Sequence, residues 1–106
     1  MGDAMSSLKD VAQYVRSKNA GPFWVTIDIF CSDRASFKRV AAAPGLEARA
    51  IARLYGVDAA RVARFTDERL NILKISFPRK HVQGSPADRD SHAGQYFVPL
   101  LDVEIT

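Results

Sequence analysis

Two polar segments carry most of the side chains that could do chemistry. The first is residues 16–21, Arg-Ser-Lys-Asn-Ala-Gly, and the second is residues 78–94, which show no apolar period. Two imidazoles and two carboxylates in the second segment form a donor set that a divalent cation would accept. Aspartates in a solvated loop also form Asx turns, which is the interpretation we favour, so we predict no metal. The candidate ligands are His81, Asp88, Asp90 and His92.

The first segment has an ordinary explanation and a chemical one. Lys18 and Asn19 stand where a helix expected over residues 8–17 gives way to a strand. A cation near the carbonyl end of a helix interacts favourably with the helix dipole, and asparagine is a common cap. A cation beside an amide also suits a carboxylate or phosphate ligand. The local pattern leaves both interpretations open.

Composition bounds the classes of protein. The 106 residues, 47% hydrophobic and 25% charged, suit a single soluble domain over residues 1–106. No stretch reaches the ~20 apolar residues of a membrane span, and the start lacks signal-peptide features, so we expect a cytoplasmic protein. Cys31 is the only cysteine, which excludes an internal disulfide and a thiolate zinc cage; we expect a small core residue. Glycine-rich phosphate loops, HExxH and GxSxG are missing from the sequence.

Charge is concentrated in the middle of the chain. The formal net charge is +3, but residues 34–80 hold eleven Lys or Arg against four acidic residues, giving +7. A basic segment suits an anionic partner such as nucleic acid, a phosphorylated cofactor or an acidic protein surface. Solvated helix faces explain it equally well, because arginines three or four apart keep a helix soluble.

Hydrophobic periodicity predicts an α+β domain. Ser7 and Asp10 form a capping box for the first helix, and Phe23–Phe30 alternates with both faces largely apolar, which indicates a central strand. The sheet should be mostly antiparallel, with the helices packed on one face. The predicted elements are helices over 8–17, 33–42 and 47–55 and strands over 23–30, 62–65, 70–77 and 100–105, with a turn at 66–69, a flexible N-terminus at 1–6 and a long polar loop at 79–95.

A helix-turn-helix is a competing prediction for residues 51–62. Gly56 would form the turn and Asp58 would cap a second helix, with Arg61 and Arg64 facing phosphates. A recognition helix should continue for about ten amphipathic residues, whereas residues 65–68 turn polar and acidic. We therefore do not favour nucleic acid as a partner.

Five sequence words together resemble a known family. They are the segments 16–23 (RSKNAGPF), Asp28, 51–56 (IARLYG), 84–90 (GSPADRD) and 99–105 (PLLDVEI). The chain resembles the family called domain of unknown function 4387 over nearly its whole length from Leu8. Members of that family are similar to companions of acyclic terpene utilisation A-type proteins, encoded beside them or fused to them.

The resemblance implies an accessory subunit or domain in the catabolism of organic acids or their coenzyme A thioesters, without a demonstrated reaction or cofactor. It also implies a ferredoxin-like arrangement, in which the turn after the first helix would approach the polar loop. A homo-oligomer and a small stand-alone lyase or hydratase, with Asp88 or His92 as general base, remain alternatives. The predicted ligand-binding residues are Ser17, Lys18, Asn19, Gly21, Ser85, Asp88, Asp90 and Gln95.

Overall fold

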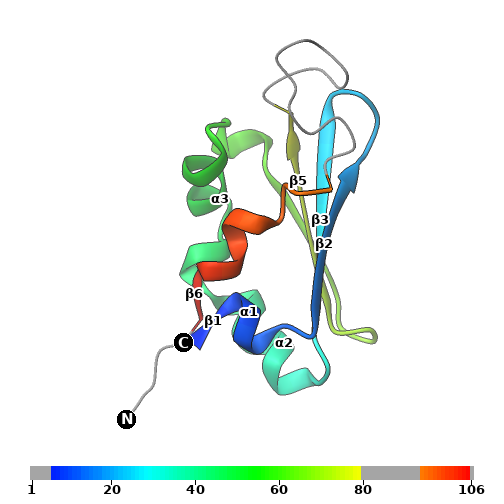
Figure 1. Ribbon diagram of the computed structural model, residues 1–106, viewed down its shortest axis with the longest axis vertical. Helices are drawn as coiled ribbons and strands as arrows, with labels where there is room; N and C mark the ends of the chain where they lie inside the picture. The colour runs from blue at the N-terminus through cyan, green and yellow to red at the C-terminus, as the bar shows by residue number, and fades with distance from the viewer. Residues whose placement is uncertain (1–5, 80–93, 106) are drawn as a thin grey trace.

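Residues 6–79 and 94–105 are described by a computed structural model (Figure 1). The strands are β1 (Ser6–Ser7), β2 (Tyr14–Asn19), β3 (Trp24–Phe30), β4 (Ala63–Asp67), β5 (Ile72–Pro78) and β6 (Glu104–Ile105). The helices are α1 (Leu8–Val11), α2 (Arg34–Ala42) and α3 (Ala48–Tyr55), with short 3-10 segments η1 (Pro44–Leu46), η2 (Ala59–Arg61) and η3 (Val98–Asp102).

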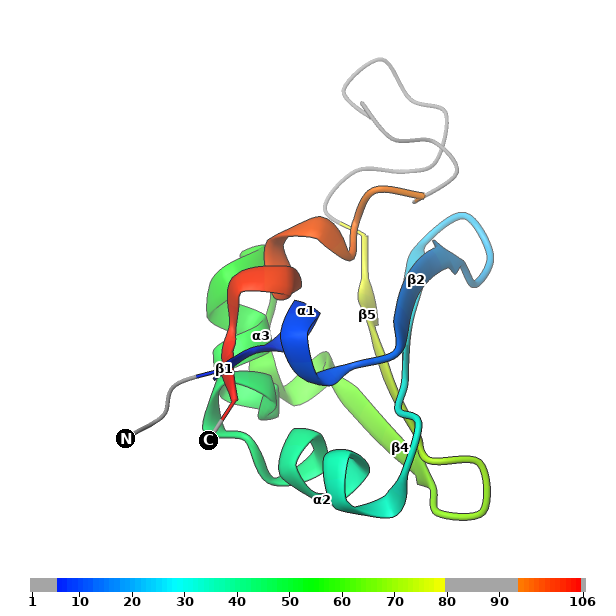
Figure 2. The ribbon, with the colours of Figure 1, turned by 60° about the horizontal axis from the view of Figure 1, so that its bottom comes forward.

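The four longer strands form one sheet in the order β2-β3-β5-β4, and every pairing between them is antiparallel. Strands β1 and β6 pair separately. The helices and η3 lie on one side of the sheet, as Figures 1 and 2 show from two directions. The α+β class, the antiparallel sheet and the one-sided helical layer are therefore confirmed.

The connectivity differs from a ferredoxin-like fold. That fold runs strand, helix, strand, strand, helix, strand. Here, within the described residues, the hairpin of β2 and β3 is followed by α2 and α3 and then by the hairpin of β4 and β5. The ferredoxin-like expectation is wrong for these four strands, because both helices lie in a single connection between two hairpins.

An apolar layer between the sheet and the helices forms the core. Strand β3 supplies Val25, Ile27 and Ile29, all fully buried, and β5 supplies residues at the same alternation. Both neighbours of β3 are paired with it, which confirms the prediction of a central strand. The core also includes Leu73, Ile75 and Phe77 of β5, together with Phe37, Val40, Ile51 and Leu100 from the helical layer.

Helices α2 and α3 begin and end where local chemistry predicts. Asp33 accepts a hydrogen bond from the Ser36 backbone N at 2.8 Å and so caps α2. Helix α3 ends at Tyr55, and its C-cap Gly56 has a left-handed φ of +69°, which favours glycine. Both helices start within one residue of the predicted boundary.

The first predicted helix is mostly wrong. The capping box exists, because Asp10 Oδ2 accepts from Ser7 N at 3.2 Å, but α1 ends at Val11. Residues 14–19 instead form β2 and pair with β3 over six positions. Val15 and Ser17 are buried while their neighbours in sequence are exposed. Apolar residues at helical spacing in the same segment favoured the helix prediction over this period-two pattern. Pairing with the apolar strand β3 stabilises the strand instead.

The C-terminal strand is also wrong over most of its length. Residues 98–102 form η3, with Pro99 in its first turn, and only Glu104 and Ile105 pair as β6. Ile105 is buried, as the predicted alternation required, whereas Leu101 and Val103 are only partly buried and Leu100 takes the core position instead. The predicted hairpin is confirmed with its turn shifted, because Asp67 Oδ1 accepts from Arg69 N at 3.1 Å and β5 starts at Ile72.

The helix-turn-helix prediction is wrong. After Gly56 the chain makes only the three-residue η2 and then enters β4. The two arginines that would have faced phosphates contact the protein itself. Arg61 lies over the Trp24 ring at 5.3 Å, and Arg64 donates to the Ala41 carbonyl at 2.9 Å at the end of α2.

Two expectations concern residues that are not described. The flexible N-terminus falls largely on 1–5 and the long polar loop largely on 80–93, both outside the described residues. In the described parts of the chain, no helix has the length and apolar character to cross a membrane.

Candidate functional site

One end of the sheet brings together residues from four segments. Ser17 and Asn19 of β2 lie on the face that carries the helices, because they share the alternation of buried Val15. Ser17 Oγ accepts a hydrogen bond from the Phe97 backbone N at 3.0 Å. This contact joins the predicted polar segment to residues 94–97, which include the predicted site residue Gln95.

Arg79 is the cation of this cluster. It follows β5, its backbone N donates to the Phe23 carbonyl at 2.7 Å, and the residue is only 8% exposed. Its guanidinium donates to Asn19 Oδ1 and lies 5.1 Å from the centre of the Tyr96 ring. A planar guanidinium supported by a ring and an amide is held in orientation, which is the arrangement that recognises carboxylate and phosphate groups.

Stacked aromatic rings support the Arg79 cluster from the helix side. Tyr55 of α3 stacks on Phe77 of β5, with ring centres 4.5 Å apart, and its hydroxyl donates to the Tyr96 carbonyl. Burial and the nearby Tyr96 raise the pKa of the Tyr55 hydroxyl above its usual value of 10.0. The hydroxyl therefore stays protonated and able to donate through the neutral range.

The structure divides the predicted site. Lys18 is exposed and pairs with Thr26, so its register places it on the opposite face from Ser17 and Asn19. Gly21 has φ of +81° in the turn between β2 and β3, where a left-handed conformation explains a glycine without a ligand. Predicted residues Ser85, Asp88 and Asp90 lie outside the described residues, so their approach to the turn stays a prediction.

Sequence reasoning missed Arg79, Tyr96 and Tyr55. Arg79 was counted only as one charge of the basic segment. A usable signal was present, because a lone arginine directly after an alternating apolar strand stands at the strand end, where side chains of neighbouring strands converge. Tyr96 and Tyr55 carried no such signal, since their contact joins residues 41 positions apart.

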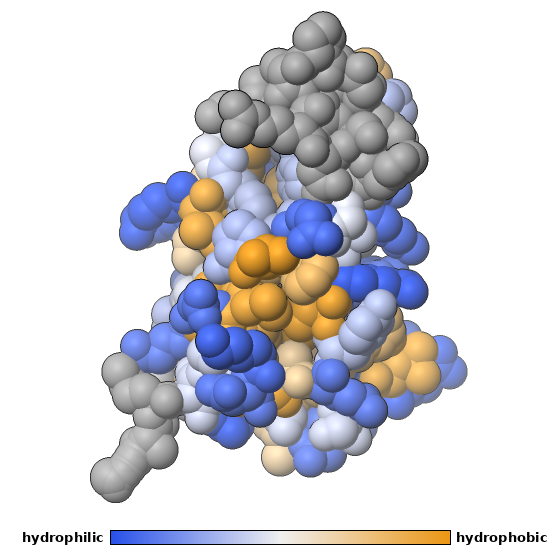
Figure 3. All heavy atoms as spheres, in the orientation of Figure 1, coloured by the Kyte–Doolittle hydropathy of each residue, from blue (hydrophilic) through white to orange (hydrophobic). Residues whose placement is uncertain are grey.

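Two further features of the described residues are Cys31 and a hollow beside η3. Cys31 is buried, and burial raises the pKa of its thiol, which confirms a core residue. In residues 6–79 and 94–105, no three histidine, cysteine or acidic side chains gather as a metal site. Figure 3 shows apolar side chains over η3 and α1, where a hollow of about 230 Å³ is lined by residues including Val15, Phe97 and Leu101.

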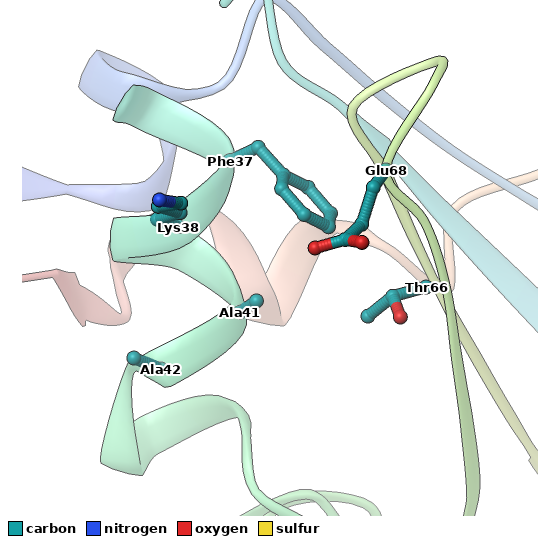
Figure 4. A pocket seen from close by; sticks show the side chains of 6 residues that line it. All are labelled: Phe37, Lys38, Ala41, Ala42, Thr66 and Glu68. Carbon is teal, nitrogen blue, oxygen red and sulfur yellow. The ribbon is translucent and has the colours of Figure 1, made fainter. Parts of the chain in front are cut away.

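A larger hollow of about 420 Å³ separates α2 from the turn between β4 and β5 (Figure 4). The Glu68 carboxylate lies beside the Phe37 ring, whereas the Lys38 side chain points away from Glu68. Two alanines and Thr66 complete a mixed lining. Lys38 and Glu68 are the two charged residues of this lining, and their side chains point apart.

No curated protein and no solved structure shows significant similarity to the chain. A family model does match, and it covers residues 8–104, which include β2, the Arg79 cluster and η3. The chain therefore belongs to the family described as domain of unknown function (DUF4387).

Proposed function

We propose that this protein is an accessory subunit or domain that completes a binding site for an anionic substrate in a larger protein. The single observation that carries the proposal is the Arg79 guanidinium, largely buried at the sheet end and oriented by Asn19 and the Tyr96 ring. A planar guanidinium held in orientation by an amide and an aromatic ring is suited to recognise a carboxylate or phosphate through two parallel hydrogen bonds.

The partner and the substrate class follow from the resemblance noted in the sequence. The partner would be an acyclic terpene utilisation A-type protein, and the substrate an organic acid or its coenzyme A thioester, in the cytoplasm. Both substrate kinds present a carboxylate or phosphate that Arg79 could contact.

Co-purification tests the subunit role. The chain is expressed with the larger protein, only the larger protein is tagged, and the eluate is analysed by size exclusion at moderate salt. Co-elution at fixed stoichiometry is expected. Separate elution, with this chain running alone, would overturn the proposal.

Ligand titration tests the Arg79 contribution. The complex is titrated by calorimetry with acetyl-coenzyme A and with acetate, comparing wild type with Arg79→Gln and Arg79→Lys. We expect Arg79→Gln to weaken binding about tenfold or more, with Arg79→Lys intermediate, because lysine keeps the charge and loses the planar fork. The matched control is Arg53→Gln on the exposed side of α3, which should leave binding unchanged. Equal binding by all variants would remove Arg79 from the site.

A further inference from the structure

The sheet face that points away from the helices is not covered by any described element (Figures 1 and 2). We call it the open face. Its side chains come from the alternate positions of the four strands, and large apolar ones remain in solvent. Tyr14 is 57% exposed and Phe65 59% exposed, at the two edge strands. The open face comprises Tyr14, Arg16, Lys18, Trp24, Thr26, Asp28, Phe30, Ala63, Phe65, Asp67, Ile72, Lys74 and Ser76.

The carboxylates of the open face are already engaged. Asp28, at the centre, has a side chain 1% exposed, with Arg16 Nε 3.1 Å from Oδ2 and Lys74 Nζ 3.3 Å from Oδ1. Asp67 accepts from backbone N–H groups of the hairpin turn. Arg16 and Lys74 each remain about half exposed. Three cations, Arg16, Lys18 and Lys74, stand against the two carboxylates, which gives the face a formal charge of +1. The three cations are exposed whereas Asp28 is buried, so the charge presented to solvent is mainly positive.

Aromatic rings of the open face hold two arginines in place, Arg16 of the face itself and Arg61 of the neighbouring η2. The Arg16 guanidinium lies 5.2 Å from the centre of the Phe30 ring, and Arg61 lies 5.3 Å from that of Trp24. Fixed arginines among tyrosine, tryptophan and phenylalanine are the composition of protein interface centres. These two arginines therefore lose little side-chain entropy when the surface is covered.

The charge and the ring geometry of the open face distinguish between three kinds of binding partner: a second copy of the chain, a nucleic acid and another protein. A second copy pairing through β2 would bring Arg16 and Lys18 of both copies together, and like charges repel. Single-stranded nucleic acid stacks its bases on exposed ring faces. Trp24 and Phe30 already carry arginines over their rings, and the exposed aromatics stand at opposite edges, so a continuous stacking track is missing from the described face. An acidic protein surface with apolar residues fits both features.

We propose that the open face docks an acidic, partly apolar surface of the larger partner protein. The identity of that partner rests on the proposed function, whereas the acidic character of the occupant rests on the open face alone. Docking on the open face would leave the Arg79 cluster, which lies on the other side of β2, outside the docking surface.

The first test measures affinity for the larger protein. The double variant Lys18→Glu with Phe65→Glu changes one exposed cation and one exposed ring on the open face. Its matched control, Arg53→Glu with Leu54→Glu on α3, makes the same changes on exposed side chains of the helical layer. Circular dichroism melting verifies that both variants fold. We expect a loss of about 30-fold or more for the first and less than about threefold for the control. Equal losses, or none, would overturn the docking surface.

A second test does not need the larger protein. Trp24 is the only tryptophan and lies on the open face, so its fluorescence reports occupancy. We expect poly-L-glutamate to change this fluorescence in a salt-sensitive manner, and the Lys18→Glu with Phe65→Glu variant to abolish the change. No change with wild type would overturn the proposal, and tighter binding of an oligo-dT strand would assign the face to nucleic acid instead. A dimer on size exclusion that the same variant splits would assign it to a second copy.

If the larger protein fails to bind the wild type while poly-L-glutamate binds it normally, only the proposed function is overturned. The surface proposal would then stand with a different acidic protein as its occupant. The two failures are therefore distinguishable.

Discussion

The two faces of the sheet are built from the same strands and use burial differently. On the helix-covered face, β3 and β5 present only apolar side chains, each nearly fully buried. On the open face of the same strands Asp28 is 1% exposed and Thr26 is 9% exposed, although no described helix covers them. The long side chains of Arg16 and Lys74 lie on either side of Asp28. One face stabilises the fold by apolar contact, whereas the other keeps a fixed array of charges.

The largest effect should come from the helix-covered face. Phe77→Ala removes a ring that is 1% exposed and stacked on Tyr55. Loss of the buried area and the cavity left behind should lower the free energy of unfolding by about 3 to 5 kcal/mol. Phe65→Ala on the open face should lower it by less than about 1 kcal/mol, because that ring is mostly in solvent. Urea denaturation measures both, and similar losses would erase the contrast between the faces.

The next effect should come from isolating Asp28. Arg16→Met together with Lys74→Met removes both cations from a carboxylate that is 1% exposed. An ion left buried without its partners should lower the free energy of unfolding by about 2 to 3 kcal/mol. Adding Asp28→Asn should recover part of the loss, since the amide carries no charge. If the triple variant is no more stable than the double, the charge at Asp28 is not the cause.

The pH dependence of stability tests the contribution of Tyr55, which packs on the helix-covered face. Tyr55→Phe removes the hydrogen bond to the Tyr96 carbonyl and should cost about 1 kcal/mol at neutral pH. The raised pKa of Tyr55 means that the folded state holds its proton more tightly than the unfolded chain does. This contribution is present below pH 10, where the unfolded tyrosine is still protonated, and is lost as pH rises beyond that value.

The wild type should therefore lose more stability above pH 10 than Tyr55→Phe does. Thermal melts between pH 8 and 11 measure the difference. Tyr14→Phe is the matched control, because Tyr14 is exposed on the open face and its ring contacts only Phe30 among the described aromatic pairs. Parallel pH curves for wild type and Tyr55→Phe would contradict the prediction.

The smallest effect concerns a neutral pair on the open face. Thr26 Oγ1 and Ser76 Oγ share a hydrogen bond at 3.0 Å across neighbouring strands. Thr26→Val alone leaves the serine hydroxyl without this bond and should cost about 1 kcal/mol. Thr26→Val with Ser76→Ala removes both polar groups and should be within about 0.5 kcal/mol of wild type. A double-mutant cycle from chemical denaturation gives the coupling, and additive losses would show that the pair is not an energetic unit.

The sequence predicted the elements that depend on local signals. Strand β3, helices α2 and α3 and the hairpin of β4 and β5 were found because caps, glycine and apolar alternation lie within each segment. The errors fall on β2 and η3, where two periods compete or a proline interrupts the pattern. Of the predicted site, Ser17 and Asn19 join segment 94–97 and Arg79, and Lys18 does not.

The sequence by itself determined the α+β class, the central strand β3 and the family. Only the tertiary structure decided that residues 14–19 are a strand, that Arg79 meets Asn19 across 60 positions and that Asp28 is buried between two cations. The physical reason is the range of the interactions. Caps and periodicity act within a few residues, whereas pairing of β2 with β3 and contacts at the sheet end need segments that meet only after the chain has folded.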